Sequence, residues 1–284
     1  MRSTAMKPML WRLPAYFPPG FPNPTKSLMM RYLFCVSVLL FYSDPTPRNQ
    51  SREEGGVMSD MVHKDIKLVL PDWLRGGPIE TKIRNGTYEN KESEAAHQRV
   101  RSGMRVLELG AGLGFVSAIC ARKAGADRVV CVEANPRMLD ALRENLRLNG
   151  ARDVTVVHGA VVNGSYDEDT VLFRAGDLFW GGTIVETGTD LNNVVEVPAL
   201  RLPDLLETHR PRLVMMDIEG AEQYLFDARW PKFVKFVVLE LHPSKYPPQT
   251  IQKIITCMSK SGLTYDPVSS NGRTLGFKRL PRKT

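Results

Sequence analysis

Val106-Leu-Glu-Leu-Gly-Ala-Gly-Leu-Gly114 is the most informative stretch of this chain. A short run typical of a buried strand leads into three glycines, and a helical pattern follows over about 115–123. Glycines at such a junction permit a tight turn and close approach of a ligand, and the first turn of a helix offers unpaired N–H groups. The last two glycines are two residues apart rather than three, which departs from the dinucleotide pattern GxGxxG. The stretch therefore predicts a strand, a ligand-binding turn and a helix.

Further strands and helices alternate on both sides of this turn. The helix expected after Asn135-Pro136 has an N-cap and an N1 proline, and Asn149-Gly150 ends it. Continuous apolar runs predict strands covered on both faces. The segment 164–198 is polar and glycine-rich and is expected to contain a hairpin. The pattern predicts an α/β fold with a mostly parallel sheet and helices on both faces, its strands near 104–109, 128–133, 154–157, 213–218, 236–241 and 274–277.

The first 60 residues differ from the rest of the chain. They are rich in proline, which excludes regular helix and central strand over most of their length. An apolar run within 28–43 is shorter than the roughly 20 residues that a membrane-spanning helix needs. Three interpretations remain: a disordered extension, a weak membrane anchor, or sequence upstream of the true start at Met58 or Met61. We expect an extension over 1–60 and one folded domain over 61–284.

Composition narrows the class of protein. The chain has 284 residues, of which 43% are hydrophobic and 24% charged, which excludes collagen-like, coiled-coil and polytopic membrane proteins. Its formal net charge of +7 is spread over mixed surface charges and identifies no partner. Four scattered cysteines without a CxxC pair indicate a reducing compartment, and we expect a cytoplasmic protein.

Two acids accompany the glycine turn. Glu108 precedes the first glycine by two residues, where a carboxylate repels a pyrophosphate and suits a sulfonium or an ammonium group. Glu133 ends the second strand, where a carboxylate can accept both hydroxyls of a ribose. S-adenosylmethionine carries all of these groups. The two acids favour this cofactor over NAD.

A second motif makes the prediction more specific. Asp217-Ile-Glu-Gly-Ala-Glu222, at the end of the fourth strand, resembles the D-[IV]-E-G-x-E signature of FkbM-family methyltransferases. The resemblance covers about 86–277, although Arg201 and Pro203 depart from the family pattern. Other matching segments follow in the family's order, namely Tyr88-Glu89-x-x-Glu92, His158-Gly-Ala-Val161, Leu200-Arg-Leu-Pro-Asp204 and Leu239-Glu-Leu-His-Pro243.

The resemblance implies a Rossmann-like class I methyltransferase with a seven-stranded sheet, S-adenosylmethionine as cofactor and O-methylation of a sugar, glycan or natural-product hydroxyl. Glu108 and the turn Gly110, Gly112 and Gly114 would hold the methionine end of the cofactor. Glu133 would hold the ribose, and Ala160 would border the adenine. The same resemblance implies that Asp217, Glu219 and Glu222 lie between the cofactor and the acceptor.

Several of these residues also have plainer interpretations. Asp217 is our first candidate for the base that removes the acceptor proton, and His242 is the second. Asp217 could instead cap a helix beginning near Ala221, and His242 could simply be satisfied by a turn. Trp180 would stack on a substrate or anchor a loop. Asp217, Glu219 and His242 could also form an oxygen-rich metal site, but their spacing in the sequence is not diagnostic of one, and no metal is predicted.

Three other functions compete with this prediction. Protein arginine or lysine methyltransferases share the E-L-G-x-G-x-G turn. Nucleic-acid methyltransferases usually end the fourth strand with a [DNS]-P-P-[YF] motif, which this chain lacks, so no nucleic-acid partner is expected. A non-catalytic binding protein would retain the fold alone. The expected partner is a small-molecule or glycan acceptor, with a membrane involved only if 28–43 is an anchor.

Overall fold

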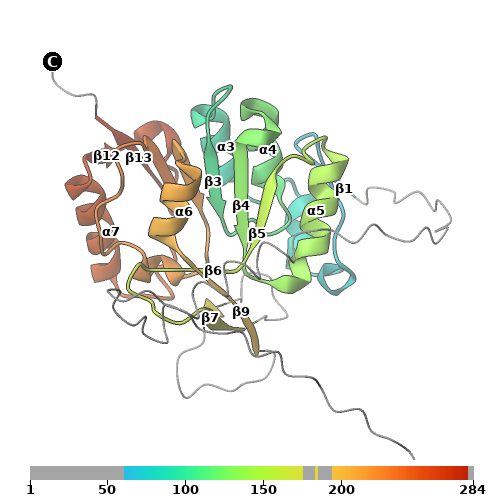
Figure 1. Cartoon of the computed structure of the whole chain (residues 1–284). Helices are drawn as coiled ribbons and strands as arrows, with labels where there is room; N and C mark the ends of the chain where they lie inside the picture. The colour runs from blue at the N-terminus through green and yellow to red at the C-terminus, as the bar shows by residue number, and fades with distance from the viewer. Residues whose placement is uncertain (1–60, 175–182, 185–193, 281–284) are drawn as a thin grey trace, which may run out of the picture. The chain divides into compact units, whose positions relative to one another are not determined.

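A twisted seven-stranded sheet forms the centre of the protein (Figure 1). A computed structural model describes residues 61–174, 183–184 and 194–280. The strands lie in the order β12-β13-β11-β10-β3-β4-β5, and pairing is parallel from β11 through β10, β3 and β4 to β5. β13 pairs antiparallel with both β11 and β12. The bounds are β3 Val106–Leu109, β4 Val129–Glu133, β5 Thr155–His158, β10 Leu213–Met216, β11 Phe236–Glu240, β12 Leu263–Tyr265 and β13 Thr274–Arg279.

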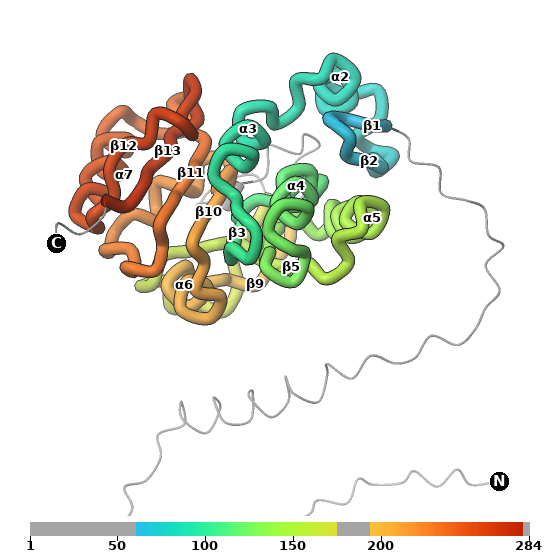
Figure 2. The backbone as a smooth tube through the Cα atoms, turned by 90° about the horizontal axis from the view of Figure 1, so that it is seen from above, coloured from blue at the N-terminus to red at the C-terminus, as the bar shows by residue number. Residues whose placement is uncertain are grey.

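Helices cover both faces of this sheet (Figure 2). One face carries α3 (Asn90–Arg99), α4 (Phe115–Ala124) and α5 (Leu139–Leu148), and the other carries α6 (Leu202–His209) and α7 (Pro248–Lys260). The predicted α/β architecture, a Rossmann-like, mostly parallel seven-stranded sheet with helices on both faces, is confirmed. Short elements complete the described chain: β1 Met61–His63, β2 Ile66–Leu68, η1 Asp72–Leu74, α2 Pro78–Arg84, η2 Ala126–Arg128, η3 Pro136–Met138, η5 Ala221–Tyr224 and η6 Pro267–Ser269.

The sheet separates two hydrophobic layers. Successive side chains of a strand point to opposite faces, so Val106 packs in the layer of α3, α4 and α5, whereas Leu107 and Leu109 pack in the layer of α6 and α7. Both faces of the central strands are therefore buried, as their continuous apolar sequence predicts.

The helix after β4 begins as its sequence predicts. The Asn135 side chain accepts a hydrogen bond from the Arg137 backbone N–H at 3.1 Å, and Pro136 opens the first turn. Leu142 and Leu146 of α5 are buried against α4 and the sheet. At the other end, Gly150 adopts φ 70°, and its N–H donates to the Arg147 carbonyl.

A second sheet of four short strands follows β5. It has the order β6-β9-β7-β8, with β6 Ala160–Val162, β7 Thr170–Arg174, β8 Thr183–Ile184 and β9 Val194–Arg201. β7 pairs antiparallel with β8 and β9, so 164–198 contains the expected antiparallel pairing. β6 continues directly from the carboxyl end of β5, which places this small sheet at that end of the parallel strands (Figure 1).

The expected extension over 1–60 lies outside the described residues, as does its apolar segment 28–43. Within 61–174, 183–184 and 194–280, no helix combines the length and apolar character needed to cross a membrane.

Candidate active site

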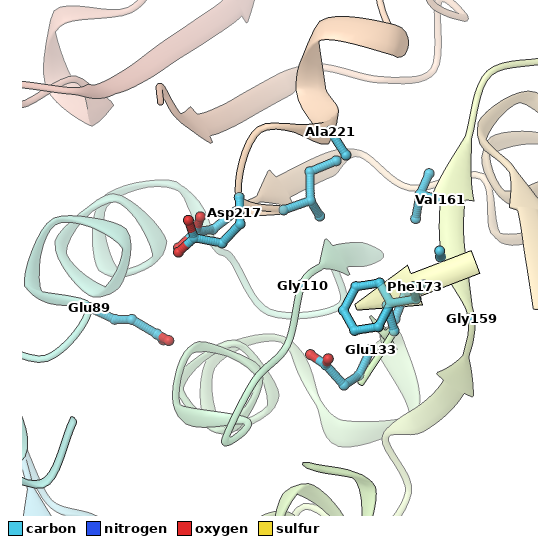
Figure 3. A pocket seen from close by; sticks show the side chains of 13 residues that line it. Glu89, Gly110, Glu133, Gly159, Val161, Phe173, Asp217 and Ala221 are labelled. Atoms are coloured by element: carbon cyan, nitrogen blue, oxygen red, sulfur yellow. The ribbon is translucent and has the colours of Figure 1, made fainter. Parts of the chain in front are cut away.

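A pocket opens at the carboxyl ends of the parallel strands (Figure 3). This edge of an open α/β sheet is where ligands usually bind. About 680 Å³ of space lies between its walls, part of it open to solvent at the mouth. Its walls come from the turn after β3, the end of β4, β6, β7 and the segment after β10: Glu89, Gly110, Val132, Glu133, Ala134, Gly159, Ala160, Val161, Phe173, Asp217, Ile218, Glu219 and Ala221.

Glu133 fixes the glycine turn from the side of β4. Its Oε2 accepts the Gly112 N–H at 2.8 Å, and its Oε1 accepts the Asn135 N–H at 2.7 Å. Burial raises the pKa of this carboxyl, although the backbone hydrogen bonds from Asn135 and Gly112 oppose the shift. The structure thus brings the predicted ribose acid and the predicted turn together. Gly112 shapes the turn through this bond at φ 53° rather than lining the pocket.

The other two glycines of the turn have different neighbours. A Cβ on Gly110 would collide with the backbone carbonyl of Asp217, so this glycine lets the turn and the segment after β10 touch. A Cβ on Gly114 would lie 2.5 Å from Leu142 Cδ1, so this glycine lets α4 approach α5. Of the three predicted cofactor glycines, Gly110 alone lines the pocket.

Glu108 lies beneath the pocket. It is 4% exposed, accepts a hydrogen bond from the Ser117 hydroxyl and lines a deeper cavity together with Glu89, Gly110 and Asp217. Burial raises the pKa of the Glu108 carboxyl to about 8, and the nearby charge of Glu133 adds to the rise while the bond from Ser117 opposes it. Without a bound cation, this acid is therefore mostly protonated at neutral pH.

The opposite end of the pocket is apolar. Ala160, which was expected to border the adenine, lines it from β6 together with Val161, and Phe173 lines it from β7. Figure 3 shows the Phe173 ring beside Glu133. Sequence reasoning missed Phe173 because 164–198 carries no motif, and the alternation of buried and exposed side chains along β7 shows only in the structure, since Val171, Leu172 and Phe173 are all apolar.

Four predicted residues gather after β10 and β11. His242 directs Nδ1 toward Glu222 Oε1 at 3.1 Å, and its Nε2 lies 3.4 Å from Asp217 Oδ1 and 3.3 Å from Glu219 Oε2. Asp217 and Glu219 line the pocket, whereas His242 and Glu222 lie behind them. Only 8% of the His242 side chain is exposed, and that of Glu222 is fully buried. The predicted base candidates are therefore neighbours at one site.

The acids shift one another's protonation. Burial raises the pKa of Asp217 well above its ordinary value, and the charges of Glu219 and Glu240 raise it further. Burial by itself would lower the pKa of His242, but the hydrogen bond and charge of Glu222 outweigh it and raise the pKa. This arrangement favours a proton shared between the side chains of Asp217 and His242, where β10 and β11 end.

The plainer interpretations can be compared with this geometry. Helix capping by Asp217 does not occur, because η5 is a single 3-10 turn whose N-cap is Gly220 and which has no side-chain cap bond. Glu222 instead accepts the Ile218 backbone N–H at 3.2 Å and holds His242, so it supports the site from behind. Trp180 lies outside the described residues.

Sequence reasoning also left out Glu89 as a site residue. It precedes α3, lines both the pocket and the deeper cavity, and adopts φ 43°, a left-handed conformation that is costly for a glutamate. Figure 3 shows its carboxylate on the same side of the Gly110 turn as that of Asp217, with Glu133 on the other side. Its signal was the Tyr88-Glu89-x-x-Glu92 segment of the family resemblance.

Similarity to a known domain covers the donor half of this site. Residues 81–174 match the family model of the TRM5/TYW2 methyltransferase domain. The matched range contains Glu89, the glycine turn, Glu133 and Ala160. The chain contains an S-adenosylmethionine-dependent methyltransferase domain. The cofactor of this methyltransferase is S-adenosylmethionine, as predicted, and the buried acids and the glycine turn fit its cationic and ribose groups.

Individual relatives are also methyltransferases. "Probable protein arginine N-methyltransferase 6" of Arabidopsis thaliana is 37% identical over 92 residues, which are 32% of this chain and 20% of that protein. Protein-L-isoaspartate O-methyltransferase of Methanococcoides burtonii is 41% identical over 61 residues, 21% of this chain and 30% of that protein. The chain thus spans less than a third of the length of either relative. The solved structure of precorrin-6y C5,15-methyltransferase from Geobacter metallireducens is 15% identical, with coverage of 70% of this chain and 78% of that chain and a TM-score of 0.39.

One expectation needs correction. The expected small-molecule or glycan acceptor is wrong, because the curated relatives named above are protein arginine and protein isoaspartate methyltransferases. The residues that misled the prediction lie after β10, in a motif whose family usually acts on hydroxyls of small molecules. The aligned segments of the relatives are 92 and 61 residues long.

Proposed function

We propose that this methyltransferase transfers a methyl group from S-adenosylmethionine to a side-chain oxygen of a protein acceptor. The observation that carries the proposal is the position of Asp217. It lines the donor pocket and also lies 3.4 Å from His242, so a group seated against it would meet both the donor and a proton acceptor. The relatives that act on proteins support the class of acceptor.

The residues of the chain would divide the work as follows. S-adenosylmethionine supplies a methyl group already activated by its sulfonium. Glu133 would hold the ribose hydroxyls, and Glu108 with Glu89 would face the cationic methionine end. Positioning of the acceptor oxygen would supply most of the acceleration. Asp217 would take the proton of an acceptor hydroxyl as attack develops, with His242 as the second candidate.

We also propose that the domain belongs to the FkbM family of methyltransferases. Asp217-Ile-Glu-Gly-Ala-Glu222 supports it, because the motif lies directly after β10 and supplies four pocket residues and the partner of His242. A reducing compartment such as the cytoplasm is proposed as its location, because Cys120, Cys131 and Cys257 are buried free thiols.

A nitrogen acceptor is the second candidate. Glu89, Asp217 and Glu219 give the pocket an acidic wall, which suits the guanidinium of an arginine side chain. The arginine methyltransferase relative also favours this acceptor.

Transfer of a labelled methyl group tests both candidates. The full chain is incubated with methyl-labelled S-adenosylmethionine and matched peptides that contain serine, isoaspartate or arginine at one position. Mass spectrometry then locates any added CH₂. Label on serine or isoaspartate supports the first candidate, and label on arginine supports the second. Donor binding without label on any peptide or on a proteome extract would overturn protein methylation.

A further inference from the structure

β10 and β11 end side by side and bring three possible metal ligands together. Met216 pairs with Leu239 in parallel register, so Asp217 and Glu240 follow at the same edge of the sheet. His242 lies two residues further on. One ligand atom from each of Asp217, Glu240 and His242 lies within 4.8 Å of the other two. Glu240 is the last residue of β11 and Asp217 directly follows β10, so adjacent strands position two of the three ligands.

The orientation of His242 is that of a metal-binding histidine. Its Nδ1 lies 3.1 Å from the carboxylate of Glu222, whose side chain is fully buried. Histidine ligands almost always donate their second ring N–H to such a carboxylate, which fixes the tautomer and turns the other nitrogen toward the ion. With Nδ1 donating to Glu222, the lone pair of Nε2 points toward Asp217 and Glu219.

Asp217 supplies an independent observation. Its Oδ1 is buried from solvent and has no hydrogen-bond partner within the described residues. This oxygen lies 3.4 Å from His242 Nε2, too long for a strong hydrogen bond. Two ligands of one ion with bonds of about 2.1 Å lie about 3.0–3.4 Å apart in octahedral or tetrahedral geometry. A buried oxygen that faces a nitrogen lone pair at this spacing is stabilised by a cation between them.

We propose that Asp217, Glu240 and His242 bind a divalent metal ion, with Glu222 positioning the imidazole. One imidazole nitrogen and two carboxylates suit Mn²⁺. Carboxylates favour this ion, and a histidine ligand disfavours Mg²⁺ and Ca²⁺, which take oxygen ligands. The Glu240 Oε1 also lies 3.1 Å from Arg273, and a carboxylate has a second oxygen to offer an ion. Glu219, which lies 3.1 Å from Lys245, is not in the group of residues whose ligand atoms all lie within 4.8 Å of one another, and it stays outside the proposed set of ligands.

The ion would deepen the proposed function, on which this step rests. Asp217 belongs both to the ligands and to the pocket wall, so an ion there would meet an acceptor oxygen beside the donor methyl group. Its positive charge would hold a carboxylate or hydroxyl oxygen and repel a guanidinium. The ion therefore selects oxygen over nitrogen as the acceptor. With the ion bound, Asp217 would serve as a ligand rather than as the base: a carboxylate acceptor is already ionised and needs no base, and the proton of a hydroxyl acidified by the ion would pass to Glu219, which lines the same pocket.

Manganese binding tests the site without any acceptor. The full chain is stripped with a chelator and titrated with MnCl₂, and free Mn²⁺ is followed by electron paramagnetic resonance. We expect one bound ion per chain, and at least tenfold weaker binding in Glu240→Gln and in His242→Ala. Glu222→Gln should weaken binding by about 10–100-fold, as expected for a residue that orients a ligand. Glu207→Gln, on an exposed acid of α6, is the matched control and should bind as the unchanged chain does.

Two results would overturn the site: no bound Mn²⁺ at millimolar metal, or unchanged binding in both Glu240→Gln and His242→Ala. Thermal unfolding identifies a variant that fails to fold, and His242→Gln then replaces His242→Ala. Titration of the metal-free chain with S-adenosylmethionine separates this failure from that of the proposed function. If the chain binds the donor and methylates without a bound metal, the proposed function stands and the metal site is overturned. If the chain binds Mn²⁺ but does not methylate, the metal site stands and the proposed function is overturned.

Discussion

Among single residues, Asp217 has the most contacts that bear on the chemistry. Its side chain lies between the donor pocket and His242, and its backbone carbonyl lies against Gly110. Asp217→Asn keeps the shape of the side chain but cannot accept a proton or bind a metal ion strongly. We expect turnover to fall by roughly 10²–10⁴-fold. The dissociation constant of the donor should change by less than about threefold, which corresponds to less than about 1.4 kcal/mol of binding free energy.

Single-turnover rates and calorimetry of donor binding measure the two quantities separately. Turnover of Asp217→Asn close to that of the unchanged chain would remove Asp217 from both the base and the ligand roles. His242→Gln would then be the next variant to compare.

Glu133 is expected to act on the donor instead. Glu133→Ala removes the acceptor of two backbone hydrogen bonds and of the proposed bonds to the ribose. We expect donor binding to weaken by about 1.5–3 kcal/mol, the usual worth of hydrogen bonds to a charged group. Calorimetry checks this value, and Glu144→Ala, on the exposed side of α5, is the control. Equal affinity in the two variants would contradict the ribose assignment.

Glu108 makes stability depend on pH. Its pKa in the folded protein is about 8, raised from 4.5 by burial, so the fold holds the proton more tightly than the unfolded chain does. The stabilisation from this group is complete below about pH 4.5 and is lost as pH rises to about 8. Glu108→Gln cannot ionise, so its free energy of unfolding should fall less than that of the unchanged chain over this range. Urea unfolding at pH 5 and pH 8 measures the difference, and parallel loss in both proteins would disprove the shift.

At the level of elements, the contact between α4 and α5 depends on Gly114. Gly114→Ala adds a Cβ 2.5 Å from Leu142 Cδ1 at a positive φ. We expect a loss of about 2–4 kcal/mol, from the left-handed backbone and from overpacking. Gly86→Ala has a similar φ of 68° but open space around its Cβ, and it should lose only about 1–2 kcal/mol. Denaturant midpoints of the two variants separate the cost of the left-handed backbone, which both share, from the clash with Leu142, which only Gly114→Ala introduces. Equal losses of unfolding free energy would show that α5 moves aside without cost.

Many of these elements could be predicted from local sequence. The strand before the glycines, the cap of α5 and the apolar strands β10 and β11 carry their signals within a few residues. The helix near Ala221 that the capping interpretation of Asp217 required is a single 3-10 turn, in which Glu222 turns inward to His242 instead of facing a helix surface. The parallel pairing of β6 with β9 was not predicted, since the two strands lie far apart in the sequence. β1 and β2 were also not predicted; they pair with each other across a tight turn, but each has only 3 residues, too few for a periodic signal.

The site was predictable to the extent that its residues lie at strand ends. Glu133, Gly110 and Asp217 follow parallel strands and meet at one edge, which the α/β pattern implies. Glu89 and Phe173 enter from outside the main sheet, and Glu240 carries no motif of its own. Their approach to the pocket depends on long-range packing, which a single sequence does not show.

For the whole molecule, the domain boundary remains a prediction. A chain shortened to residues 58–284 should unfold with the same midpoint and bind S-adenosylmethionine as tightly as the full chain, because the family resemblance and the sequence periodicity both begin after residue 60. Scanning calorimetry and donor titration check this expectation. Loss of a cooperative transition in the shortened chain would show that the first 57 residues belong to the fold.

The close approach of Gly110 to the Asp217 carbonyl has a consequence for how this enzyme could acquire new substrates. The donor turn and the acid segment press on each other through their backbones, so an inserted or deleted residue at 217 would displace the cofactor along with the acceptor. Side-chain exchange at 218–222 leaves that backbone contact in place, and so does a change in length between β7 and β9. Engineering or natural divergence of specificity is therefore expected to proceed through those two routes, with the spacing between β10 and Asp217 held constant.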